Sequence, residues 1–257
     1  MFKCDRNGLL VFTRFPQPGQ TKTRLIPALG ADGAADLQRQ MTVHLLKKLM
    51  MFWPQRFSGE ASTPEQTRSQ TRLQIHFSGG TVEQMQTWLE SSVTSSVTSR
   101  SCSVAQLEPP PIPPLIAQCE GDLGMRLRFA LQQGFENEFE RIVVMGSDCP
   151  AVSEPLVTQA VNLLAHYDVV LGPALDGGYY LMGLRKMALS RFGTLFENIP
   201  WSTDNVLSLT LKAAASAGLS VDLLQPLSDI DRPEDLPMWY ALQKNSMCCK
   251  ITSGWLD

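Results

Sequence analysis

Short apolar runs alternate with longer amphipathic segments along most of this chain, and that alternation limits the folds open to it. Runs rich in Val, Ile, Leu and Phe predict strands at 8–13, 72–77, 141–145, 168–172, 179–184 and 221–224. Apolar residues at helical spacing and helix-start signals predict helices at 32–52, 82–89, 123–135, 154–165, 203–217 and 233–242. Strands that alternate with helices in this way are typical of a mainly parallel, doubly wound α/β sheet.

Two segments interrupt the alternation, at about 54–71 and 91–103. Both are rich in Ser and Thr and hold few large apolar side chains, so they cannot bury enough apolar area to offset the entropy lost on ordering. We therefore expect a single domain over residues 1–257 that carries two mobile, dispensable surface insertions. The proline run at 109–114 is expected to be an extended segment at the edge of the sheet.

The bulk composition excludes several classes of function. A net charge of −3 argues against a broad nucleic-acid surface. The apolar run at 9–12 is too short for a signal peptide core, and no segment approaches the length of a membrane span. The six cysteines form no CxxC pair and no zinc-type cluster, which favours a reducing cytoplasm. We expect small-molecule partners, no nucleic acid and no membrane.

Ligands of doubly wound sheets bind beyond the carboxyl ends of the strands, and charged residues gather at these positions here. Asp148 follows directly after an apolar run in VVMGSDCPAV. One interpretation is that Ser147 and Asp148 only begin a turn, with Pro150 preventing the strand from continuing. The other is that the Asp148 carboxylate holds a ligand.

The loop after the first predicted strand reads PGQTKTRL and places Lys22 and Arg24 close to Pro18 and Gly19. Arg14, at the end of that strand, adds a third positive charge. Loop amides combined with cations make a cradle for phosphate groups. The GxxxxGK[ST] pattern of a P-loop is absent. The alternative is a solvated basic loop without a ligand.

Two later loops offer carboxylates whose roles the sequence leaves open. In CEGDLGMRL, Asp122 fits the N-cap of the next helix, while Gly121 and Gly124 would let the backbone approach a ligand closely. In LSDIDRPEDL, Asp231 fits an Asp-x-x-Glu capping box, which leaves Asp229 without a structural explanation.

A third loop, GPALDGGYYLMG, is a strong hairpin signal because Asp176, Gly177 and Gly178 separate two apolar runs. Tyr179 and Tyr180 would also bring aromatic faces to the turn. Glycines admit a bulky ligand, tyrosines stack on a sugar face, and the Asp176 carboxylate accepts hydrogen bonds or acts as a general base.

Cations in the first loop and carboxylates in the later ones together predict a metal–phosphate site. Mg²⁺ and Mn²⁺ take oxygen ligands, usually one or two carboxylates plus substrate phosphates. The three histidines fall inside or at the ends of predicted helices and strands, so neither Ser-His-Asp nor Cys-His chemistry is indicated.

Six stretches resemble a bacterial glycosyltransferase family of the arsenosugar-biosynthesis and selenium-domain-associated type: FPQPGQTKTRLIPALG, QCEGDLGMRL, VVMGSDCPAV, GPALDGGYYLMGL, IPWST and DIDRPEDL. KTRLIPALG is also similar to guanylyltransferases of cofactor synthesis. The resemblance runs from about residue 9 to 242 and implies the glycosyltransferase A-type, nucleotide-diphosphosugar transferase fold. There are departures from the pattern: Arg14 replaces lysine, Cys119 replaces glycine, and Asp148 lacks the partner of an Asp-x-Asp pair.

The resemblance implies glycosyl transfer from a nucleotide sugar to a small acceptor, with Mg²⁺ or Mn²⁺ as cofactor. It assigns phosphate binding to Lys22 and Arg24, and metal binding to Asp148 and Asp231, with Asp229 as a substitute ligand. The implied sugar and acceptor contacts are Asp176, Gly177, Gly178, Tyr179 and Trp201. The alternatives are a nucleotidyltransferase that uses a nucleoside triphosphate and a phosphorylated small molecule, and an inactive nucleotide-binding protein.

Overall fold

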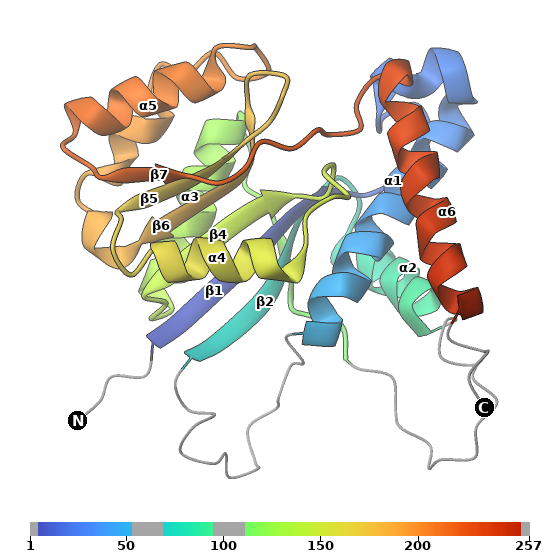
Figure 1. Ribbon diagram of the computed structural model, residues 1–257, viewed down its shortest axis with the longest axis horizontal. Coiled ribbons are helices and arrows are strands. Elements are labelled where there is room, and N and C mark those ends of the chain that lie inside the picture. Colours follow the sequence, from blue (N-terminus) through green and yellow to red (C-terminus); the bar gives the residue numbers. More distant parts are fainter. Residues whose placement is uncertain (1–4, 53–68, 95–110, 253–257) are drawn as a thin grey trace, which may run out of the picture.

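The computed structural model describes residues 5–52, 69–94 and 111–252. Its centre is a seven-stranded sheet with the order β3-β2-β1-β4-β6-β5-β7 (Figure 1). The strands are β1 (Asp5–Arg14), β2 (Ser69–Ser78), β3 (Leu115–Ala117), β4 (Arg141–Gly146), β5 (Val169–Pro173), β6 (Tyr179–Arg185) and β7 (Val221–Leu223). Every predicted strand is present, and most of the predicted ends lie within one residue of the observed ones.

The sheet is parallel except at β6, which runs antiparallel to both β4 and β5. This reversal follows from the Asp176-Gly177-Gly178 turn, which joins β5 to β6 as a hairpin. β1 and β4 lie side by side, with Val11 paired with Met145. The carboxyl ends of β1, β2 and β4 therefore meet at one edge, together with the turn that enters β6.

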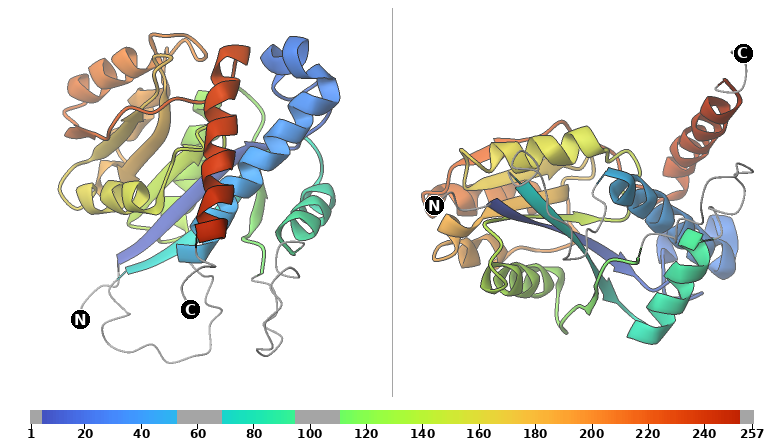
Figure 2. Two further views of the ribbon diagram at one scale, coloured as in Figure 1. Left: turned by 45° about the vertical axis from the view of Figure 1, so that its right-hand side comes forward. Right: turned by 90° about the horizontal axis from the view of Figure 1, so that it is seen from below.

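Helices cover both faces of the sheet, as Figure 2 shows for α3 and α4. The helices are α1 (Ile26–Phe52), α2 (Val82–Thr94), α3 (Leu123–Glu136), α4 (Glu154–Leu163), α5 (Val206–Ser216) and α6 (Leu236–Thr252). Alternate strand residues serve opposite cores: Val11 packs with α1, α2 and α4, whereas Leu10 packs with α3 and α5. The helix α6 lies beside α1, where Trp239 packs against Leu37 and Met41.

Several predicted boundaries are wrong. The element α1 consists of two helical pieces, 26–29 and 31–52, which meet at a kink at Gly30 (φ 71°, ψ 168°); the helix predicted from residue 32 is the second piece, and the short first piece was not predicted. The helix predicted over 203–217 begins only at Val206. The last helix extends to Thr252, after a 3-10 turn at Pro233–Asp235.

The two predicted insertions are shorter than expected on the sides that the structure describes. Residues 69–71 belong to β2, and residues 91–94 belong to the last turn of α2. The remaining parts, 54–68 and 95–103, lie outside the described residues. At the edge of the sheet, the Pro114 carbonyl accepts a hydrogen bond from the amide of Ile75 just before β3, so the end of the proline run is an extended edge segment.

Among the residues that the structure describes, no helix is both long and apolar enough to cross a bilayer.

Candidate functional site

A cavity of about 630 Å³ opens at the carboxyl ends of the central strands. Its lining comes from the loop after β1, the end of β4, the β5–β6 turn, the start of α3 and the segments 201–203 and 229–231. The predicted site residues that line it are Arg14, Lys22, Arg24, Asp148, Asp176, Tyr179, Trp201, Asp229 and Asp231. The parallel topology thus brings together residues that are up to 217 positions apart in the sequence (231 minus 14).

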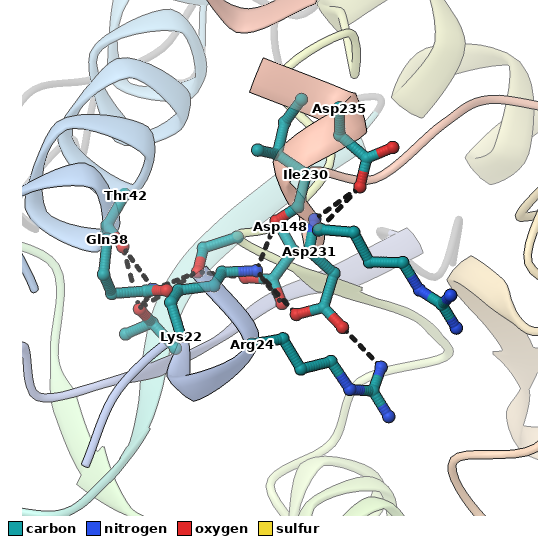
Figure 3. Close-up of polar contacts among 11 residues, drawn as sticks. Lys22, Arg24, Gln38, Thr42, Asp148, Ile230, Asp231 and Asp235 are labelled. Carbon is teal, nitrogen blue, oxygen red and sulfur yellow. Dashed lines mark hydrogen bonds and ion pairs between the residues drawn. The ribbon is translucent and has the colours of Figure 1, made fainter. Parts of the chain in front are cut away.

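Lys22 lies at the centre of the charged part of the cavity (Figure 3). Its Nζ donates to the carbonyl of Ile230 at 2.6 Å and forms ion pairs with Asp148 Oδ2 at 3.0 Å and Asp231 Oδ1 at 3.6 Å. Its side chain is only 4% exposed. Its backbone is left-handed, with φ 49° and ψ 46°, a conformation that costs a non-glycine residue about 1 kcal/mol or more. The solvated-loop interpretation is wrong for Lys22.

Asp231 faces the cations instead of capping the following helix. Arg24 Nη1 donates to Asp231 Oδ2 at 2.6 Å. The carboxylate of Asp235 accepts from the backbone amides of Asp231 and Arg232, at 3.0 and 2.8 Å, and so takes the capping role. The Asp-x-x-Glu capping box predicted for Asp231 is therefore wrong, and the Asp231 carboxylate belongs to the charged cluster.

Asp148 both ends its strand and joins this cluster. Its backbone carbonyl accepts from the Ile230 amide at 2.9 Å, which fixes the segment 229–231 next to β4. Its carboxylate pairs with Lys22, a contact that a turn does not require. The turn interpretation and the ligand interpretation of Asp148 are therefore compatible.

A buried polar network, which the sequence did not predict, supports this end of the cavity. Gln38 of α1 donates through Nε2 to Ser147 Oγ at 2.9 Å, and the same nitrogen lies 3.1 Å from Thr42 Oγ1 and 3.3 Å from Thr13 Oγ1. The Ser147 hydroxyl lies 3.4 Å from Asp148 Oδ1. The network ties α1 to the ends of β1 and β4 directly behind Asp148.

Asp229 is the carboxylate whose environment most disfavours its charge. Burial is the largest cause that raises its pKa, the nearby charges of Asp176 and Asp148 add to it, and Lys22 opposes them, so that the pKa is about 7. Asp229, for which the sequence offered no structural role, thus lines the same cavity as a carboxyl group with a raised pKa.

The donor set suits a divalent metal only in partnership with a substrate. Within 5–52, 69–94 and 111–252, no three His, Cys, Asp or Glu side chains form a group able to hold a metal ion. Lys22 bridges Asp148 and Asp231, the two carboxylates assigned to the metal. Mg²⁺ is commonly held by one or two carboxylates while substrate phosphates and water fill the remaining positions, and these residues fit that arrangement.

The β5–β6 turn forms a second part of the cavity lining, through Asp176. Asp176 Oδ1 accepts from the Gly178 amide at 2.9 Å and shapes the turn. Gly177 has φ 91°, and a Cβ there would lie 2.1 Å from the carbonyl of Asp204. The Leu207 amide at the start of α5 donates to the Gly177 carbonyl at 2.9 Å. The turn therefore packs directly against the start of α5, and only glycine fits at position 177.

Aromatic rings extend this part of the lining. Tyr179 meets Trp201 edge to face, with ring centroids 6.5 Å apart. Tyr180 differs from the prediction: it is 5% exposed, and its hydroxyl donates to the carbonyl of Gln225 at 3.0 Å. Its ring packs against Gly172, so Tyr180 is mainly a core residue and Tyr179 carries the aromatic face.

Other predicted residues lie outside the cavity lining: Pro18, Gly19, Gly121, Asp122, Gly177 and Gly178. Asp122 is the N-cap of α3 and accepts from the Met125 amide at 2.8 Å, as one of the two interpretations predicted. The lining also includes residues that were not predicted, among them Gln38, Gln118 and Arg126. Arg126 lies in the CEGDLGMRL stretch, one helical turn after Asp122. Its place in the first turn of a helix that follows a strand was the signal that could have predicted it.

Comparisons with known proteins agree with this architecture. The sequence model of a bacterial family described as "Uncharacterized protein conserved in bacteria (DUF2064)" matches residues 66–203, which are 138 of the 257 residues. A crystal structure of a "putative nucleotide-diphospho-sugar transferase" from Desulfovibrio desulfuricans G20 is 31% identical, with a TM-score of 0.71, over 93% of this chain and 88% of that one.

Two more distant similarities concern nucleotide-using enzymes. The 2-phospho-L-lactate guanylyltransferase of Methanothermobacter thermautotrophicus is 31% identical over 110 residues, which are 40% of this chain and 49% of that protein. The chain thus matches about half the length of this curated relative. The CMP:2-keto-3-deoxy-manno-octonic acid synthetase, solved with CTP, covers 94% of this chain at 11% identity and a TM-score of 0.50, which shows the fold alone.

The expected fold class is thereby confirmed, while the arsenosugar and selenium associations stay predictions. With more than half of its residues matched by the family model, and a nucleotide-diphospho-sugar transferase-like fold, this chain belongs to the bacterial DUF2064 family.

Proposed function

We propose that this protein transfers a glycosyl group from a nucleotide sugar to a small acceptor with the help of Mg²⁺ or Mn²⁺. One observation carries the proposal: a single cavity joins the charged cluster around Lys22 to the wall formed by Asp176, Tyr179 and Trp201. Its volume of about 630 Å³ is in the range of sites that hold small ligands and cofactors.

The charged part would hold the diphosphate of the donor. Arg14, Lys22 and Arg24 are the cations of the first loop, and all three line the cavity. Asp148 and Asp231, with Asp229 nearby, would share a divalent ion with the phosphates. When bound, that ion would neutralise charge that develops on the leaving diphosphate.

The wall formed by Asp176, Tyr179 and Trp201 would hold the sugar and the acceptor. The exposed Asp176 carboxylate retains Oδ2 for a ligand, because its turn contact uses Oδ1. It would accept the proton of an acceptor hydroxyl as the general base. The rings of Tyr179 and Trp201 offer apolar surface of the kind that packs on a sugar face.

Nucleotidyl transfer is the second candidate, and the similarity to 2-phospho-L-lactate guanylyltransferase favours it. That reaction would use a nucleoside triphosphate and release pyrophosphate, so it needs dense positive charge in the first loop. That enzyme, however, matches only 40% of this chain, whereas the structure described as a "putative nucleotide-diphospho-sugar transferase" matches 93% of it at 31% identity. We therefore favour glycosyl transfer. A binding protein that has lost catalysis is a third candidate, supported by the incomplete metal site of the described residues.

Product identity distinguishes the three candidates. The full chain would be incubated with Mn²⁺ or Mg²⁺, a panel of nucleotide sugars or nucleoside triphosphates, and a panel of small acceptors. Release of nucleoside diphosphate from a nucleotide sugar is the expected result, and both EDTA and Asp148→Asn should abolish it. Release of pyrophosphate would establish nucleotidyl transfer instead. Nucleotide binding without any product would support the inactive protein, and no binding at millimolar concentration would contradict all three.

A further inference from the structure

The helix α3 turns one charged residue toward the cavity. Leu123, Arg126 and Leu127 line the cavity from this helix, at the i, i+3, i+4 spacing of a single helical face. Leu127 is buried in the core beneath the cavity floor, and the same face continues into the core at Leu131. Arg126 is therefore a cation on a face that otherwise serves apolar packing.

Arg126 has no carboxylate partner among the residues that the structure describes. Its Nε is fully covered and forms no hydrogen bond. Lys22 and Arg24, two cations of the first loop, are by contrast paired with Asp148 and Asp231. A guanidinium stays charged at every physiological pH, and a covered donor without a partner is rare in native proteins. The positive charge of Arg126 is thus available to an anion in the cavity.

The position of α3 assigns this charge to the acceptor side of the cavity. A Cβ on Gly124 would lie 2.6 Å from Trp201 Nε1, so the first turn of α3 packs directly against Trp201. Trp201 in turn contacts Tyr179 of the acceptor wall. The other cations of the described lining, Arg14, Lys22 and Arg24, belong to the end of β1 and the loop after it, which the proposed function gives to the donor phosphates.

We infer that Arg126 binds an anionic group, a carboxylate or a phosphate, on the acceptor substrate. The inference rests on the proposed function, because it takes this wall of the cavity as the acceptor site. An arginine fork matches the two oxygens of either group. The acceptor would then be a small hydroxyl compound with a negative charge rather than a neutral sugar.

Calorimetry on the full chain tests this inference. The donor site is first saturated with Mn²⁺ and the tightest-binding of UDP, GDP, CDP and ADP. Three probes with one carbon skeleton are then titrated: glycerol 3-phosphate, glycerate and glycerol. We expect at least one of the two anions to bind more tightly than glycerol, and Arg126→Met to weaken its binding about tenfold or more, the loss of a charge-assisted hydrogen bond. Arg126→Lys should retain part of the affinity, because it keeps the charge and loses the fork.

Arg128→Met is the matched control, since Arg128 lies on the same helix, is exposed and does not line the cavity. Equal binding of all three probes, or an unchanged anion affinity in Arg126→Met, would overturn the inference. A loss of nucleotide affinity in Arg126→Met would also overturn it, because Arg126 would then serve the donor. Failure of the unmodified protein to bind any nucleotide would instead contradict the proposed function.

Discussion

Replacing Asp229 by asparagine should stabilise the protein, although Asp229 lies in the candidate site. Burial, Asp176 and Asp148 together raise the pKa of Asp229 to about 7 in the folded protein. In the unfolded chain an aspartate has a pKa of about 4. Between about pH 4 and pH 7 the folded state therefore holds more protons than the unfolded state, so the free energy of unfolding falls as the pH rises through this window.

The magnitude follows from the shift and the exposure. A shift of about three pKa units would correspond to about 4 kcal/mol for a group without solvent contact. Asp229 is only partly buried, and solvent screening reduces the expected penalty to about 1–2 kcal/mol above pH 7. Asparagine has nearly the same shape and no charge. Asp229→Asn should therefore exceed the unmodified protein by about 1–2 kcal/mol at pH 8, less at pH 5, and not at all near pH 4.

Urea unfolding followed by tryptophan fluorescence would measure these differences, in EDTA so that no metal compensates the charge. Asp32→Asn is the control, because Asp32 is exposed on α1 and lies outside the cavity, and it should leave the unfolding free energy unchanged at each pH. The reasoning would be refuted if Asp229→Asn were no more stable than the unmodified protein at pH 8, or if the gain in unfolding free energy were the same at pH 4 and pH 8.

Three further changes test the geometry of the site. Lys22→Met removes the cation between Asp148 and Asp231 and should lower the free energy of unfolding by about 1–2 kcal/mol at pH 8. This is about half the cost of breaking a fully buried pair, because both carboxylates are about half exposed. The deficit should shrink in acid, and a deficit that persists at pH 4 would point to packing instead. Asp148→Asn should leave the protein folded, because Lys22 keeps Asp231 as a partner, but weaken metal-dependent nucleotide binding tenfold or more in calorimetry, the effect of losing about 1.5 kcal/mol. Unchanged binding would leave Asp148 as a turn residue only. Gly177→Ala should lower Tm more than Gly19→Ala, since both have positive φ but only Gly177 faces a backbone carbonyl, that of Asp204; equal losses would exclude the steric cause.

Local pattern predicted most of the fold because its strands are buried on both faces. The run 141–145 and the hairpin at Asp176 are apolar stretches bounded by clear turn signals, and both were confirmed. The start of α1 was missed because Gly30 resembles a helix terminus in the sequence. At Gly30 the chain kinks and a second helical piece follows, while Leu25, just before the first piece, packs in one cluster with Leu236 and Trp239 of α6.

The site was predictable in its members more than in its contacts. Parallel strands bring their carboxyl ends together, so the order of strands and loops along the chain is enough to group Arg14, Asp148 and Asp229. The pairing of Lys22 with Asp148 joins residues 126 positions apart, and no local pattern records it. Gln38 was missed for a similar reason: on its helix it is one polar residue among many, and only the fold shows its contacts with Thr13 and Ser147.

On the proposed function, the ion pairs of Lys22 predict that metal and nucleotide bind cooperatively. The sequence assigns Lys22 to phosphate and Asp148 and Asp231 to the metal, yet in the structure these groups neutralise one another. A metal arriving alone must compete with Lys22, and a nucleotide arriving alone meets a lysine already paired. When both arrive, Lys22 can turn to the phosphates while the carboxylates take the metal, and no charge is left unpaired. Such coupling is reciprocal and typically amounts to about 1–3 kcal/mol, or roughly 5–150-fold. Calorimetry should therefore show Mn²⁺ tightening nucleotide binding by at least about fivefold, and nucleotide tightening Mn²⁺ binding by the same factor. Lys22→Met should lose most of this coupling and bind Mn²⁺ alone more tightly than the unmodified protein does. Independent binding of the two ligands to the unmodified protein would mean that Lys22 stays paired with Asp148 throughout.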